Sequence, residues 1–457
     1  MKRSAPLVRD NASNKRLKHD IPAYHLTPQQ RDAKGQAIWP APREQIHHAQ
    51  KIILDCANSK QNTLLVPDKD ADGLTSGAIL YTTLVLLGLP QDRISVHLLS
   101  KGNNVFSEVE LAAVAAYEPS YIFVLDHGSR VGPPLLSRPH TALVIDHHQT
   151  TPSDFPTGAA YVTACDSPPV ATSSLLTYLI CEALHSDVES KCDWLAIIGT
   201  HGDLGTNLKW EPPFPNMADP LKRYSKKALN EAVSALNAPR RTAEYDVSSA
   251  WDALRQACDT DDPVAGLKKL LQNSRLRAAR EEIRLEVERC THAPPKFGRD
   301  GRVAVLRIRS PCQVHPIIAT RWAGFLAAKK LEIIMVANDG YLEGKVNFSC
   351  RVAKSARGWD RPPNVIELLE EYANQADDEK LRTRLGENFA RGHKEASGGI
   401  VDKDVFEGLI KTMKIGEKPP AEEGKSGGTP KKSKGPPPQR NTLLKYFEGK
   451  SQDNERL

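Results

Sequence analysis

Carboxylates and imidazoles gather in four short clusters in the first half of the chain. The first cluster, in LLVPDKDADG, follows an apolar stretch and contains Asp68, Asp70 and Asp72. Three carboxylates at alternating positions repel one another strongly unless a cation binds them. A divalent-metal site is therefore the most economical interpretation of this segment. Such a metal could lower the pKa of a bound water.

A calcium loop of the EF-hand kind is the obvious competitor, because it shares the opening D-x-D-x-D-G. It needs a bidentate Glu at its twelfth position, which here is Ile79. The segment before Asp68 is also typical of a strand, whereas an EF-hand has a helix there. Both features argue against a calcium loop.

The other three clusters lie further along the chain. They are Asp126 in YIFVLDHGS, Asp146, His147 and His148 in ALVIDHHQ, and Asp203 in IIGTHGDLG. A single Asp at a strand end is usually a turn or helix-cap residue, and adjacent histidines are often surface residues. We nevertheless expect all four clusters where strands end, which is where open α/β sheets bind their ligands. Four such coincidences are hard to explain separately.

The elements that must position these clusters can be predicted from about Trp39 onward. Apolar runs predict strands over 63–66, 94–99, 121–125 and 142–145, and helical patterns cover 75–87 and 173–184. Continuous apolar runs indicate strands that are buried on both faces. The pattern therefore predicts an α/β domain over residues 39–225, with a mostly parallel sheet between helices.

A second domain is predicted after a helical connector over residues 226–294. The connector ends in the charged stretch LKKLLQNSRLRAAREEIRLEVERC, which we interpret as one long helix. Strands are then predicted over 303–308, 332–337 and 342–352, with helices over 316–329 and 365–372. The chain is thus expected to hold a second, smaller α/β domain over residues 295–414.

The order D-x-D-x-D-G, D-x-G, D-H-H and G-T-x-x-D resembles the four motifs of the DHH superfamily of phosphoesterases. The triple-Asp form of the first motif resembles that of the RecJ-type single-strand nucleases. A later segment, ARGHKEASGG, resembles the G-G-H-x-x-A-x-G motif of the DHH-associated domain, although Arg391 replaces its first Gly. The resemblance implies a DHH catalytic domain joined to a DHH-associated substrate-binding domain.

The resemblance also implies roles for individual residues. Two divalent cations would be bound by Asp70, Asp72, Asp126, His147 and Asp203. The catalytic residues would include Asp68, Asp146 and His148, with His148 touching the scissile phosphate or completing a coordination sphere. Mixed carboxylate and imidazole ligands favour Mn²⁺, with Mg²⁺ as the alternative.

Substrate contacts are expected from the second domain. The candidates are His393, Gly392, Arg351 and the backbone amides of the loop 392–399. His127 and His201 lie beside ligand positions, and each could either support a ligand or serve in packing.

The function implied is metal-dependent hydrolysis of phosphodiesters, by an exonuclease acting on single-stranded DNA or RNA in nuclear replication or repair. One alternative is a phosphodiesterase for oligonucleotides or cyclic dinucleotides, since no room remains after Lys414 for the OB-fold that grips single strands in larger RecJ-type enzymes. Another is a noncatalytic replication scaffold, although every ligand position here is filled.

Both ends of the chain, residues 1–38 and 415–457, are basic, poor in apolar residues and expected to be disordered. The KR and KRLK clusters near the start resemble a bipartite nuclear localisation signal, with a cytoplasmic location as the alternative. No apolar run approaches the roughly 18 residues of a membrane span. The eight cysteines are scattered, so we expect reduced thiols.

The C-terminal segment QRNTLLKYF contains Leu443, Tyr446 and Phe447 behind a basic, Pro-rich linker. It resembles the peptide that docks on the sliding clamp, proliferating cell nuclear antigen. Arg440 stands where that motif usually begins with Gln. A short helix that packs back on the enzyme is the other interpretation.

Overall fold

The computed structural model describes residues 28–417 except 293, 379 and 387. Leu443, Tyr446 and Phe447 lie outside the described residues, as do the basic clusters near the start of the chain. The described part contains two β-sheets, one of five strands and one of six. It therefore confirms the predicted α/β class.

The first sheet is entirely parallel, with the strand order β2-β1-β3-β4-β5. Its strands are β1 (Thr63–Pro67), β2 (Ile94–Val96), β3 (Tyr121–Leu125), β4 (Thr141–Asp146) and β5 (Ala160–Thr163). The first four strands agree with the prediction. The fifth was not predicted, because it is short and only half of it is buried, so it has no continuous apolar run.

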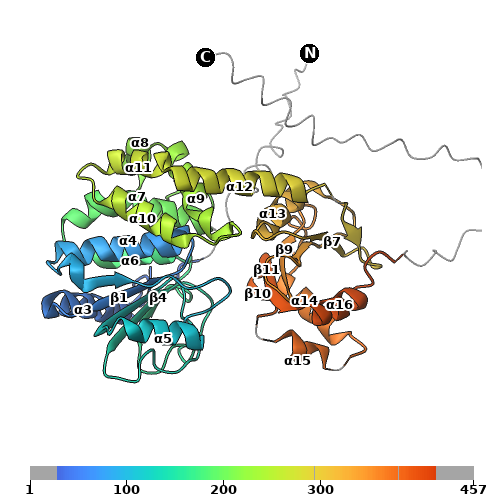
Figure 1. The fold of residues 1–457 in the computed structure, drawn as a ribbon, viewed down its shortest axis with the longest axis horizontal. Helices are drawn as coiled ribbons and strands as arrows, with labels where there is room; N and C mark the ends of the chain where they lie inside the picture. Colours follow the sequence, from blue (N-terminus) through green and yellow to red (C-terminus); the bar gives the residue numbers. More distant parts are fainter. Residues whose placement is uncertain (1–27, 293, 379, 387, 418–457) are drawn as a thin grey trace, which may run out of the picture. The chain divides into compact units, whose positions relative to one another are not determined.

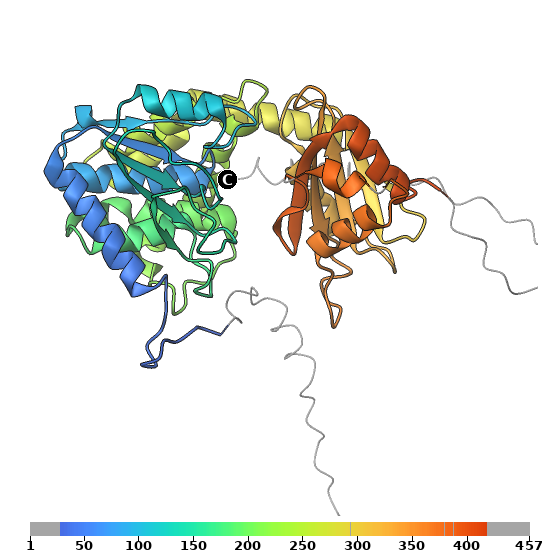
Figure 2. The ribbon, with the colours of Figure 1, turned by 90° about the horizontal axis from the view of Figure 1, so that it is seen from below.

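Helices cover both faces of this sheet, as predicted (Figure 1). On one face lie α3 (Arg43–Ser59), α4 (Ala71–Leu86), α6 (Ser173–Glu182) and α7 (Asp187–Asp203), which share one large apolar core. On the other face α5 (Glu108–Ala116) packs through Val114 against Leu64 and Ile122. The short helix η1 (Gln91–Arg93) comes directly before β2. Figure 1 shows the strands between α5 and the layer of α4 and α6, and Figure 2 shows the same domain from below.

The predicted connector is helical throughout the residues described. It comprises α9 (Lys226–Asn237), η2 (Pro239–Arg241), α10 (Val247–Cys258), α11 (Pro263–Gln272) and α12 (Ser274–Cys290), and α8 (Ala218–Tyr224) precedes it. The single long helix expected at its end is two helices, because the Asn273 side chain accepts hydrogen bonds from the backbone N–H groups of Arg275 and Leu276 and so starts α12. Leu276 of α12 packs in the first core, whereas Ile283 packs against the second sheet.

The second sheet is mixed, with the order β10-β11-β9-β8-β7-β6. Its strands are β6 (Lys296–Phe297), β7 (Val303–Ile308), β8 (Ile333–Asn338), β9 (Lys345–Val352), β10 (Arg391–His393) and β11 (Ala396–Asp402). Only β7 and β8 pair in parallel. Helix α13 (His315–Phe325) covers one face, and α14 (Val365–Asn374), α15 (Leu381–Leu385) and α16 (Lys403–Thr412) cover the other (Figure 1).

The segment 392–399, expected to be a loop that offers its amides to a substrate, is instead a β-hairpin of β10 and β11. Strand β11 lies between β10 and β9, so most of its amides are engaged in the sheet. All eight cysteines are free thiols. Across residues 28–417, apart from the three left out, none of the helices is both long and apolar enough for a bilayer.

Candidate metal centre and adjoining pocket

Three neighbouring strands of the first sheet deliver most of the predicted ligands to one edge. Asp68 follows β1, Asp126 follows β3 and Asp146 ends β4. Because these strands are parallel and adjacent, their carboxyl ends meet at the same edge. We expected Asp203 at the end of a strand as well, but it is the last residue of helix α7. It reaches the same site because α7 packs against α4.

The predicted ligands form three overlapping groups whose oxygen or nitrogen atoms lie within 4.8 Å of one another. The groups are Asp72, His147 and Asp203; Asp68, Asp70 and Asp126; and Asp126, His147 and His148. The first two groups share no residue. The structure thus brings together two adjacent candidate cation positions, with Asp126 and His147 between them.

The surroundings of the His147 side chain indicate whether these residues could bind a cation. Its Nε2 atom lies 3.1 Å from Asp203 Oδ2, 3.3 Å from Asp126 Oδ1 and 3.7 Å from Asp72 Oδ2. Although it faces three carboxylates, this buried atom has no hydrogen-bond partner among the described residues. Burial disfavours the charged ring, yet Asp126 and Asp203 raise the pKa of His147 well above its usual range. A buried imidazole nitrogen among carboxylate oxygens is the donor set that Mn²⁺ or Zn²⁺ would accept.

The N-terminus of helix α6 holds the Asp72 carboxylate. The backbone N–H groups of Ser173 and Ser174 donate to it at 2.8 and 3.0 Å, as expected for an anion at a helix N-terminus. Burial and the neighbouring charge of Asp203 nevertheless raise the pKa of Asp72 to about 6. The Ser173 hydroxyl donates to Asp126 at 2.9 Å. Burial and the charge of Asp72 raise the pKa of Asp126 well above its usual range.

Asp146 has a different position from the other carboxylates. Its Oδ1 atom accepts from the backbone N–H of His147 at 2.8 Å and from that of His148 at 3.2 Å. The same oxygen lies 2.8 Å from His148 Nδ1. Asp146 belongs to none of the three groups, and its contacts favour a positioning role, so its catalytic role stays a prediction. It contacts Nδ1 of His148, whose side chain is 49% exposed.

Cationic side chains that we did not predict lie beside the carboxylates. Lys69 Nζ is 2.9 Å from Asp68 Oδ1, and Arg240 Nη2 is 3.6 Å from Asp70 Oδ2. Burial alone would raise the pKa of Asp68, but the charge of Lys69 holds it well below its usual range. Burial and Arg240 lower the pKa of Arg241 to about 9, and its Nε atom has no partner among the described residues. The only sequence signal was the basic pair itself after Pro239.

Both histidines left open by the sequence bind protein atoms. His127 Nε2 lies 2.8 Å from the carbonyl oxygen of Val66, which fixes the ring against β1. His201 Nδ1 lies 2.8 Å from Asn230 Oδ1, and Trp210 Nε1 donates to its other nitrogen at 3.3 Å. Neither histidine belongs to a candidate metal group.

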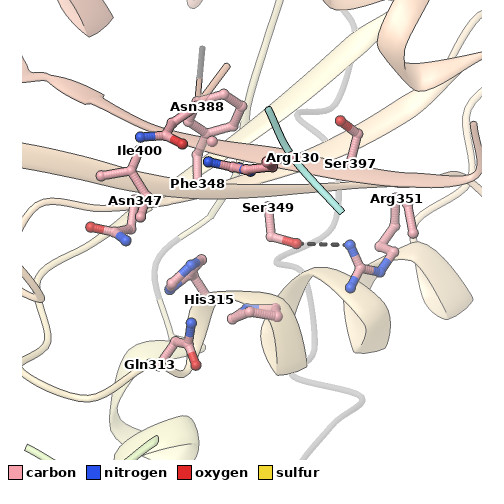
Figure 3. A pocket seen from close by; sticks show the side chains of 14 residues that line it. Arg130, Gln313, His315, Asn347, Phe348, Ser349, Arg351, Asn388, Ser397 and Ile400 are labelled. Atoms are coloured by element: carbon pink, nitrogen blue, oxygen red, sulfur yellow. Dashed lines mark hydrogen bonds between the residues drawn. The ribbon is translucent and has the colours of Figure 1, made fainter. Parts of the chain in front are cut away.

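A pocket of about 330 Å³ lies on the second sheet, between α13 and strands β9 and β11 (Figure 3). Arg351 points into it and donates to Ser349 Oγ at 2.8 Å. Buried His315 Nδ1 and Asn347 Oδ1 have no hydrogen-bond partner within the described residues. Burial and the charges of Arg351 and Arg241 lower the pKa of His315 to about 3.

The pocket also receives Arg130 from the first domain, a residue that we did not predict. Arg130 follows Asp126 by four positions in the segment after β3. The floor of the pocket needs glycine, because a Cβ atom on Gly398 would come within 2.3 Å of the Phe348 carbonyl oxygen. The arrangement suits a polar, anionic ligand of nucleotide size.

Of the predicted substrate contacts, Arg351 lines the pocket, whereas Gly392 and His393 are placed by their backbone alone. Gly392 pairs with Ser397, and His393 pairs with Ala396, whose partner on the other side is Arg351. The side chains of residues 391–393 lie outside what the structure describes. Their role as substrate contacts stays a prediction.

Comparison with known proteins agrees with this geometry. The profile of the DHH family, N-terminal domain, matches residues 62–200. RecJ from Thermus thermophilus, solved in complex with Mn²⁺, is 18% identical with a TM-score of 0.56, over 82% of this chain and 55% of RecJ. The DHH domain of a protein described as a member of a family of ribosomal proteins is 14% identical with a TM-score of 0.59, over 82% of this chain and 91% of that one.

The chain therefore spans little more than half the length of the RecJ chain that it matches. No curated protein sequence matches it. The family profile covers every candidate metal ligand except Asp203, and the structural likeness extends the match into the second domain. Residues 62–200 thus match the DHH family, N-terminal domain, and the chain has a RecJ-like fold.

Proposed function

We propose that this protein hydrolyses phosphodiester bonds in single-stranded DNA or RNA, as an exonuclease that uses two divalent cations. The observation that carries the proposal is the buried Nε2 atom of His147, which faces three carboxylates without a hydrogen-bond partner among the described residues. Two groups of ligands that share no residue lie side by side around it. A pair of cations suits the in-line displacement at a phosphodiester.

One cation would be held by Asp72, His147 and Asp203, and the other by Asp68, Asp70 and Asp126. When bound, the cations lower the pKa of a water molecule and neutralise negative charge on the leaving oxygen. Imidazole among the ligands favours Mn²⁺ over Mg²⁺, which prefers oxygen ligands. The α6 N-terminus and the Ser173 hydroxyl keep Asp72 and Asp126 in place.

The phosphate groups would be bound by the cationic side chains at the edge of the site. The side chain of His148 is 49% exposed, and Asp146 contacts its Nδ1 atom. Arg241 has a buried Nε atom that still needs an acceptor, and a phosphate oxygen supplies one. Arg351 and Ser349, with His393 as a further candidate, would bind the next nucleotide in the pocket.

The test is cleavage of 5′- and 3′-labelled single strands of DNA and RNA, with Mn²⁺ and Mg²⁺ compared. His147→Ala and Asp146→Ala should each lose at least about 100-fold in kcat, since one removes a metal ligand and the other the group that orients His148. The double variant His47→Ala/His48→Ala is the matched control, because this adjacent pair is exposed on α3. Undiminished cleavage by the folded His147→Ala variant refutes the proposal. If the wild-type protein shows no metal-dependent turnover, the result favours a noncatalytic replication scaffold.

A short-substrate phosphodiesterase is the second candidate. The observation that favours it is the pocket of about 330 Å³, which lies at the lower end of the range for small-ligand sites. Cleavage rates that peak at two or three nucleotides and fall for longer strands would support it. Rates that rise or stay level with length would support the single-strand exonuclease.

We extend the proposal to a role in nuclear replication or repair, supported by the basic N-terminal clusters and the clamp-like motif of Leu443, Tyr446 and Phe447. A peptide of residues 436–453 should bind proliferating cell nuclear antigen, and Leu443→Ala/Phe447→Ala should abolish binding. Equal binding of both peptides would remove the clamp as a partner.

A further inference from the structure

Six of the exposed cations in the second domain that take part in no ion pair among the described residues lie on two neighbouring segments. They are Arg321, Lys329, Lys330, Lys354, Arg357 and Arg361, which we call the α13-end surface. Many other basic residues of this domain are paired, such as Arg302 with Glu332 and Arg307 with Glu407. The surface therefore concentrates positive charge that the protein itself does not neutralise.

Two chain segments far apart in sequence build this surface together. The backbone N–H of Lys354 donates to the Ala323 carbonyl at 2.9 Å, and that of Ala353 donates to the Glu332 carbonyl at 2.8 Å. Ala323, Leu331 and Ala353 share one small apolar core. Segments 321–332 and 353–359 thus lie side by side.

Aromatic rings stand among these cations. Phe325, the last residue of α13, is 69% exposed, and Trp359 is 39% exposed. Large aromatic side chains at such exposure, beside a surplus of positive charge, are typical of surfaces that stack unpaired bases and attract phosphates. Asp360 is the acidic residue on the same segment.

The α13-end surface begins where the pocket ends. His315 and Pro316, at the start of α13, line the pocket, and Phe325 ends the same helix about 15 Å further on. On the neighbouring strand, Arg351 lines the pocket and Lys354 follows three residues later. A strand with one nucleotide in the pocket could continue along α13 to the surface.

From this placement we infer that the α13-end surface binds the part of a single-stranded nucleic acid that extends beyond the pocket. The inference rests on the proposed function, since it takes the pocket as the site of a nucleotide. Charge and stacking together make this grip independent of sequence. It would let a chain with a small pocket act on long strands.

Binding of a fluorescein-labelled 20-nucleotide poly-dT to the full chain tests the inference, by anisotropy with EDTA so that no cleavage occurs. Arg321→Glu/Lys354→Glu should raise the Kd at least tenfold, and lower the slope of log Kd against log salt by roughly 1.4, for two lost phosphate contacts. Its matched control is Lys380→Glu/Lys411→Glu, which changes the charge equally at exposed positions of the same domain that form no ion pair with a described residue. Phe325→Ala/Trp359→Ala should raise the Kd about tenfold with the slope unchanged.

The inference fails if Arg321→Glu/Lys354→Glu binds the 20-mer as tightly as its control. It also fails if Arg321→Glu/Lys354→Glu weakens the binding of a trinucleotide as much as the binding of the 20-mer, since the two charges would then act at the pocket. A third contrary result is equal competition by polyglutamate, which would mean an unspecific anion surface. Failure of the proposed function is distinguishable, because a protein that never cleaves can still show the predicted binding difference.

Discussion

Ser173 offers the sharpest test of the proposed metal centre. Its hydroxyl donates to Asp126 at 2.9 Å, and its backbone N–H donates to Asp72 at 2.8 Å. Ser173→Ala removes the hydroxyl and keeps the backbone contact. The substitution therefore affects one candidate ligand, Asp126, without touching a ligand side chain.

The size of the effect follows from the burial of Asp126, which is 2% exposed. A hydrogen bond to a charged group contributes about 1.5–3 kcal/mol, and about 1.4 kcal/mol corresponds to one pKa unit. The pKa of Asp126, which burial already raises, should thus rise by roughly 1–2 further units. Because protons then compete better with the cation, Mn²⁺ affinity should fall about 10- to 100-fold.

Mn²⁺ binding can be measured by calorimetry between pH 6 and 8, and the deficit should grow as the pH falls. Ser76→Ala is the matched control, because the Ser76 hydroxyl is also buried but donates to the backbone carbonyl of Asp72 inside its own helix. Excess Mn²⁺ should restore turnover in Ser173→Ala. The reasoning is refuted if Ser173→Ala binds Mn²⁺ as tightly as Ser76→Ala, or if its deficit does not change with pH.

Three further predictions concern other parts of the molecule. Gly199→Ala should lower the free energy of unfolding by about 1–3 kcal/mol in urea titrations, because its Cβ would lie 2.1 Å from Ser174 Oγ, where α6 and α7 pack; an unchanged midpoint would contradict this packing. Arg241→Gln should leave stability unchanged or higher, since it removes a poorly paired buried charge, while kcat falls at least about tenfold; full activity would exclude a phosphate contact. The free energy of unfolding of the wild type should fall as the pH drops below 6.5, by up to about 1.4 kcal/mol per pH unit. The reason is that His315 is protonated in the unfolded chain from about pH 6.5 but in the folded chain only near pH 3. Urea titrations at pH 4–7 should show that His315→Asn lacks this pH-dependent loss.

The predictions from sequence succeeded where a residue's environment is local. The runs before Asp68, Asp126 and Asp146 are continuous and apolar, and such runs form strands that are buried on both faces. Their ends then meet because the strands are parallel and adjacent. The positions of these three carboxylates could therefore be predicted from the pattern of apolar residues along the chain.

The contacts that hold the site are different in kind. Ser173 reaches Asp72 across 101 positions of sequence, and no local pattern indicates such a pairing. Asp203 was expected at a strand end but lies on α7, since an apolar run before an Asp does not distinguish a buried helix from a strand. Strand β11 escaped prediction because ASGGIVD contains two adjacent glycines and only a short apolar end.

The short helix η2 connects the metal centre with the pocket. Arg240 lies beside Asp70 and also donates to Gln313 Oε1 at 3.5 Å, while the Arg241 carbonyl accepts from the Gln313 backbone N–H at 2.8 Å. Gln313 lines the pocket. Under the proposed function, the separation between the cations and a nucleotide in the pocket would decide which phosphodiester is cleaved, and these contacts help to fix that separation. A substitution in η2 should thus change where the enzyme cuts as well as how fast, whereas loss of a metal ligand should change the rate alone.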